Sequence, residues 1–127
     1  MYNEANKGHK GNITQDSLVE VTAYLFMKNG YQATTMQEIA DYLNIKKGSI
    51  YYYIKTKEDF LYNIGNISMT MLLNEAQKIY DKDIDPQQKV TLLMQSHLKM
   101  IAENINLFTV SLRDLNKTNA KVYWPKI

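Results

Sequence analysis

The chain contains no cysteine, only two prolines and five glycines, and no long apolar run. The lack of cysteine excludes a disulfide framework, a thiolate zinc site and a cysteine nucleophile. No segment approaches the roughly 18 consecutive apolar residues of a membrane span, and the polar start does not have the pattern of a signal peptide, so we expect a cytoplasmic protein with no membrane partner. The 127 residues suffice for one compact domain, or for two small lobes that share a core.

Capping residues and apolar periodicity predict six helices, and therefore an all-α fold. Breakers are scarce, and no alternating apolar run bounded by turn residues indicates a sheet. The expected helices cover about residues 15–29, 36–43, 47–54, 57–80 and 86–103, with a sixth after Asn106. Two of them begin at capping-box sequences, which start at Thr35 and Thr56.

A tight helix–turn–helix is predicted around Asn44, because the junction needs a residue that tolerates positive φ and Asn is the usual choice after glycine. In the helix that follows, Ile50 and Ile54 mark the buried side. The three consecutive tyrosines at 51–53 span about 200° of the helix surface, so at least one of them faces outward.

Positive charge is concentrated around this third helix. Four lysines lie within twelve residues with no acidic residue among them: Lys46, Lys47, Lys55 and Lys57. The net charge of +2 does not by itself indicate a nucleic-acid partner, but this cluster is local. A helix that presents lysine, serine and tyrosine can offer donors and flat polar rings to phosphates and base edges. Gly48 would let backbone amides approach a phosphate.

Residues 14–61 resemble the DNA-binding domain of the tetracycline-repressor (TetR) family of bacterial regulators. The resemblance lies in the stretch NGYQATTMQEIADYLNIKKGSIYYYIKTKEDFL and in the apolar helix before it. It implies a flexible arm at 1–13, a three-helix domain with a helix–turn–helix at 14–60, and part of a helical ligand-binding and dimerisation domain at 61–127. It also implies a transcriptional regulator, expected to be a repressor, that binds double-stranded operator DNA as a homodimer. A small-molecule effector would release the DNA.

The resemblance further implies which residues contact DNA. They are Thr35, Lys46, Lys47, Gly48, Ser49, Tyr51, Tyr52, Tyr53 and Lys57. Thr35 and Lys57 fall at phosphate-contacting helix starts, whereas Lys46 stands where the family often has a small hydroxyl residue. Plainer roles stay open for four of these residues: Tyr53 borders the buried stripe, Thr35 is a helix cap first, and Lys46 and Lys57 are also compatible with solvated lysines.

Four residues of the second half are candidate contacts for the effector: Met94, His97, Met100 and Phe108. Methionine repacks easily around apolar ligands, and residues 97–115 are faintly similar to family members that sense acyl-coenzyme A esters. An apolar or acyl-CoA-like effector is therefore one expectation. The alternative interpretation is that these four residues belong to the core, with His97 on an apolar stripe beside Val90 and Leu93.

The family continues through further helices, of which the last two build the dimer interface, so we expect a regulator truncated at its C-terminus. The competing hypothesis is a helical interaction module that associates with a full-length relative or another protein without binding operator DNA. An enzyme is not expected, nor a cofactor or metal site, because the sequence has no glycine-rich phosphate loop, no HExxH and no paired metal ligands.

Overall fold

The described part of the chain folds into six α-helices, in agreement with the all-α prediction. The computed structural model describes residues 13–114 and contains no strand within that range. The helices are α1 (Gln15–Asn29), α2 (Met36–Leu43), α3 (Lys47–Tyr53), α4 (Lys57–Tyr80), α5 (Pro86–Glu103) and α6 (Ile105–Asp114). The predicted arm at 1–13, apart from Ile13, and the predicted end of the second domain at 115–127 lie outside the described residues.

Side-chain caps fix where the helices begin. Thr14, Thr35 and Thr56 each accept a hydrogen bond from the backbone N–H three residues later and complete a capping box, which satisfies amides that a helix start leaves unpaired. Asn44 ends α2 in the left-handed conformation, with φ 55° and ψ 47°. The helix–turn–helix junction therefore has the backbone geometry that the sequence predicts.

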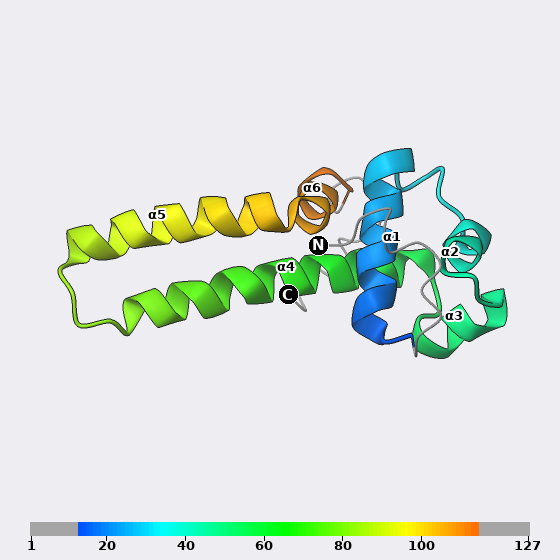
Figure 1. Ribbon diagram of the computed structural model, residues 1–127, viewed down its shortest axis with the longest axis horizontal. Coiled ribbons are helices and arrows are strands. Elements are labelled where there is room, and N and C mark those ends of the chain that lie inside the picture. The colour runs from blue at the N-terminus through cyan, green and yellow to red at the C-terminus, as the bar shows by residue number, and fades with distance from the viewer. Residues whose placement is uncertain (1–12, 115–127) are drawn as a thin grey trace.

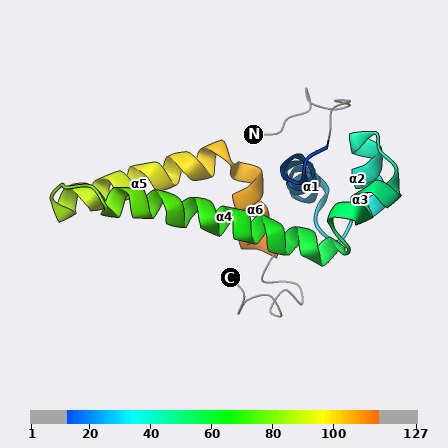
Figure 2. The same cartoon turned by 90° about the horizontal axis from the view of Figure 1, so that it is seen from below.

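The buried core joins α1, α2, α3, the first part of α4 and one side of α6. Phe26 of α1, Ile39 of α2, Ile50 of α3 and Phe60 of α4 are all fully buried within it. Phe26 and Phe60 meet edge to face, with ring centroids 6.4 Å apart. This core lies at one end of the molecule, and α2 and α3 lie on its outer side (Figures 1 and 2).

The other end of the molecule is a long hairpin of α4 and α5, and α6 packs against both α1 and α4 (Figure 1). No residue of α5 is buried. The predicted placement of Val90, Leu93 and His97 in a core is therefore wrong: all three are exposed, because within the described residues α4 and α6 cover only part of the α5 surface. No helix among residues 13–114 is long and apolar enough to cross a membrane.

Candidate nucleic-acid interface

The helix–turn–helix presents α3 at the end of the molecule opposite the α4–α5 tip (Figures 1 and 2). Ile50 holds α3 on the core with a fully buried side chain, and Ile54 is buried just after the helix. The α3 helix ends one residue before the predicted boundary, because Ile54 has an extended backbone that leads into the cap of α4. The rest of α3 is free to face outward.

The three tyrosines of α3 differ in exposure. Tyr52 is 85% exposed, Tyr51 44% and Tyr53 38%. The Tyr53 hydroxyl donates a hydrogen bond of 3.0 Å to the backbone carbonyl of Ile13, and its ring meets the Tyr52 ring edge to face at 5.1 Å. Tyr51 and Tyr52 are thus outward-facing side chains of α3, whereas Tyr53 also anchors the start of the described chain.

Lys46, Lys47 and Lys55 surround these tyrosines with positive charge. All three are exposed, and none pairs with an acidic side chain among residues 13–114. Gly48 and Ser49 are exposed between them. We call the exposed set Lys46, Lys47, Gly48, Ser49, Tyr51, Tyr52 and Lys55 the α3 face. It brings together six of the nine residues for which the resemblance implies DNA contact.

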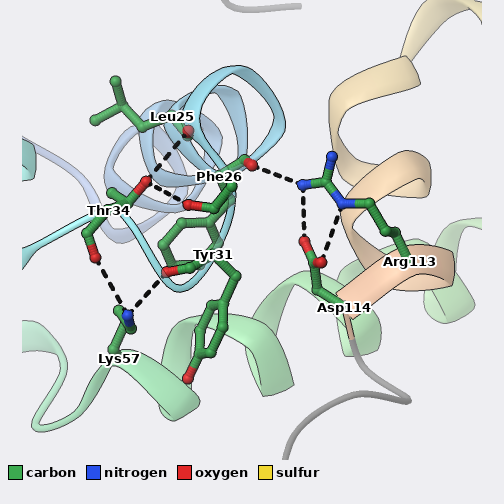
Figure 3. Close-up of polar contacts among 8 residues, drawn as sticks. Leu25, Phe26, Tyr31, Thr34, Lys57, Arg113 and Asp114 are labelled. Carbon is green, nitrogen blue, oxygen red and sulfur yellow. Dashed lines mark hydrogen bonds and ion pairs between the residues drawn. The ribbon is translucent and has the colours of Figure 1, made fainter.

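Thr35 and Lys57 lie at helix starts near this face and have partners inside the protein. The Thr35 hydroxyl accepts the Glu38 N–H at 3.1 Å, so its capping role is confirmed. Lys57, the first residue of α4, is half-buried and donates to the backbone carbonyls of Tyr31 and Thr34 (Figure 3). It also donates to the carbonyl of Gln32. Lys57 is therefore not the solvated lysine that the sequence left open.

A second cation, Arg113, reaches the end of α1 from α6, and no motif in the sequence indicated it. Arg113 donates to the Phe26 carbonyl at 2.6 Å and, in a fork, to the carboxylate of the buried Asp114 (Figure 3). The hydrogen bond to Asp114 raises the pKa of Arg113. The acceptors of Arg113 and Lys57 include backbone carbonyls, which every residue carries, so no side-chain pattern reveals such contacts.

The four candidate effector contacts lie on α5 and α6 and differ in burial. Met94 and His97 lie on α5 without being buried, Met100 is half-buried, and Phe108 is buried in α6. An apolar hollow of about 370 Å³ does lie between α4 and α5. Its lining residues are Leu73, Ala76, Gln77, Ile79, Tyr80, Lys89, Val90 and Leu93, which include none of the four.

Residues 18–63 match the family of bacterial regulatory proteins described as the tetR family. The fatty acid metabolism regulator protein of Bacillus subtilis is 27% identical over 107 residues, which are 84% of this chain and 53% of that protein. The HTH-type transcriptional repressor KstR2 of Mycolicibacterium smegmatis is 31% identical over 87 residues, which are 68% of this chain and 42% of that protein. Both relatives are named as regulators, and the second as a transcriptional repressor.

The fold is that of a solved TetR-family structure. The transcriptional regulator PfmR from Thermus thermophilus superposes with a TM-score of 0.75 at 27% identity, over 82% of this chain and 57% of that one. The chain thus spans about half the length of the relatives that it matches. The sequence match to the family covers the whole helix–turn–helix.

Proposed function

The chain belongs to the TetR family of bacterial regulatory proteins, and on that premise we propose that residues 14–60 bind double-stranded operator DNA. The α3 face enters the major groove, where Ser49, Tyr51 and Tyr52 meet base edges and Lys46 and Lys47 meet phosphates. Tyr53 adds contacts at the edge of this surface. The Thr35 hydroxyl, which caps α2 and donates to the Glu38 carboxylate at 3.3 Å, turns its O–H from that carboxylate to a phosphate when DNA binds.

One observation carries this proposal: the α3 helix buries Ile50 and turns its polar rings and its unpaired lysines outward on one surface. An 85% exposed tyrosine such as Tyr52 contributes little to the core and leaves its ring and hydroxyl available to a partner. Unpaired ammonium groups beside it favour a partner that is negatively charged. Duplex DNA matches both features.

In this proposal the chain acts in the cytoplasm as a repressor, as its relative KstR2 is named, and a second copy occupies the other half of the operator. A small-molecule effector releases the DNA. The relative named as a fatty acid metabolism regulator supports an apolar or acyl-CoA-like effector. Met94, His97, Met100 and Phe108 remain the candidate contacts, on α5 and α6.

A second candidate function, a helical interaction module without operator binding, draws support from α5. Apolar side chains stand exposed along this helix, among them Met94 at 62% and Leu98 at 67%. Exposed apolar surface favours association with another protein. The two candidates differ in one measurable property, which is the affinity of the chain for duplex DNA.

The test measures binding to a fluorescein-labelled duplex that the wild-type chain has selected from a random-sequence library. We expect log affinity to fall linearly with log salt concentration, as for a protein that neutralises phosphates. Tyr52→Ala should cost about 1–3 kcal/mol of binding free energy, while the matched variant Tyr80→Ala, an exposed tyrosine at the end of α4, should cost none.

Both variants should unfold at the wild-type temperature, because both rings are exposed. Equal losses of affinity in the two variants would show that tyrosine exposure in general, and not the α3 face, carries the binding. No attraction of the wild-type chain to duplex DNA, even at low salt, would favour the interaction module instead.

A further inference from the structure

The ammonium group of Lys57 is engaged inside the protein. It donates to the carbonyl oxygens of Tyr31 at 2.8 Å, Thr34 at 3.3 Å and Gln32 at 3.4 Å. It also lies 4.4 Å from the centre of the Tyr31 ring. A lysine ammonium has three N–H donors, and three carbonyls use them all. A phosphate oxygen can bind this group only by displacing one of the carbonyls.

We propose that Lys57 is a positioning residue for the DNA-reading helices and not a phosphate contact. This inference rests on the proposed function. The Thr34 carbonyl belongs to the peptide bond that leads into Thr35, the N-cap of α2. By holding that carbonyl, Lys57 fixes the start of α2 against the start of α4.

The place of Lys57 in α4 supports a structural role for its charge. It is the first residue of the helix, where the helix dipole disfavours a cation, so the carbonyls are what stabilises an ammonium there. The turn that supplies these carbonyls is also bonded to α1: the Thr34 hydroxyl lies 3.3 Å from the Leu25 carbonyl (Figure 3) and donates to the Gly30 carbonyl at 2.8 Å. The turn from residue 31 to 34 is thus tied to the end of α1 by Thr34 and to α4 by Lys57.

The position of the α3 face depends on this tie, because α3 packs against α2 and α2 begins at the held peptide. Loss of the Lys57 ammonium removes the hydrogen-bond donor of the three turn carbonyls. The first residue of α2 is then no longer fixed relative to α4. The exposed lysines of the α3 face keep their charge. Operator affinity should therefore fall, while the number of phosphates neutralised stays the same.

The experiment compares Lys57→Met with Lys47→Met, using the selected fluorescein-labelled duplex between about 50 and 200 mM salt. Methionine keeps most of the length of the side chain and its packing on the Tyr31 ring but removes the charge and the donors. We expect Lys57→Met to bind at least about fivefold more weakly with an unchanged salt slope. Lys47→Met should lower the slope by about 0.9, the value for one phosphate that is no longer neutralised.

If Lys57→Met does not fold, an NMR measurement on the wild-type chain decides whether Lys57 contacts a phosphate. The Lys57 ammonium protons should exchange slowly with water, and their NMR signal should keep its position when the duplex is added. The Lys47 signal should move on binding.

Three results would overturn the positioning role: a fall of about 0.9 in the salt slope of Lys57→Met, wild-type affinity in that variant, or a Lys57 signal that shifts with DNA as that of Lys47 does. Absence of binding by the wild-type chain is a different outcome. It would overturn the proposed function itself, and the positioning role with it.

Discussion

Gly48, the second residue of α3, has no steric reason to be glycine within the described part of the protein. A Cβ built at this position meets no atom within 4 Å, and Gly48 is not among the residues with positive φ. Glycine inside a helix is destabilising by roughly 0.5–1 kcal/mol relative to alanine. The position is therefore suboptimal for folding, which fits a surface that a partner approaches closely.

Gly48→Ala should raise the free energy of unfolding by about 0.5–1 kcal/mol and lower the affinity for the selected duplex. The added methyl group stiffens the unfolded chain but stands where the DNA backbone comes near α3. Denaturant unfolding and fluorescence anisotropy measure the two effects. Gly30→Ala is the contrasting variant: φ at Gly30 is 88°, so alanine is strained there and should destabilise the fold. Unchanged duplex affinity in Gly48→Ala would contradict this role of the glycine.

Residues whose role depends on neighbours along the chain could be predicted, and residues whose role depends on distant backbone could not. Thr35 and Asn44 act on groups within a few positions, so their types reveal the cap and the turn. Lys57 binds carbonyls 23 to 26 positions away, and a carbonyl has no signature in the sequence. For that reason its position in a basic cluster indicated only a phosphate contact or a solvated side chain.

At the scale of elements, the predicted helix boundaries agree closely with the structure, whereas the predicted burial fails for one helix. The boundaries follow from local signals such as Thr56 before α4 and Asp85-Pro86 before α5. Burial depends on which other elements cover a helix, and periodicity does not identify them. The apolar stripe of α5 was for this reason predicted as core, although no residue of α5 is buried.

The exposed state of α5 predicts how its backbone exchanges hydrogen. A helix without buried side chains can open locally at little cost, so the amides of α5 should exchange roughly tenfold or more faster than those of α1, which buries seven residues. Hydrogen–deuterium exchange resolved by residue measures this difference. The first half of α4, with Phe60 and Ile64 buried, is the internal reference and should exchange as slowly as α1. Equal protection in α5 and α1 would mean that α5 is covered in solution.

At the scale of the whole molecule, two connections join the helix–turn–helix end to the hairpin. One is α4, which runs through both parts (Figure 2). The other is α6, which packs on α1 and α4. Ser111 of α6 donates to the buried Ser68 of α4 at 3.0 Å, and Arg113 donates to the Phe26 carbonyl near the end of α1. A displacement of α6 would therefore act directly on the end of α1, beside the turn that leads to α2.

Arg113→Met tests how much the α6 connection contributes to stability. The variant removes the partner of the Asp114 carboxylate, whose side chain is 9% exposed, and also frees the Phe26 carbonyl. We expect a loss of about 1–3 kcal/mol in the free energy of unfolding, because a buried charged group that loses its partner keeps its desolvation cost. Lys99→Met is the control, since the Lys99–Glu103 pair is well exposed and should contribute less than about 1 kcal/mol.

The double variant Arg113→Met/Asp114→Met separates two effects of losing Arg113: the loss of the ion pair itself, and the cost of leaving the Asp114 carboxylate buried without a partner. If the stability lost in Arg113→Met comes from the unpaired carboxylate, removing that carboxylate as well should restore part of the free energy of unfolding. The double variant should then unfold at a higher denaturant concentration than Arg113→Met alone. Denaturant titrations of the single and double variants give the coupling free energy. A double variant less stable than Arg113→Met would show that Asp114 contributes through contacts other than its pair with Arg113. In that case the α6 connection would not depend on this pair.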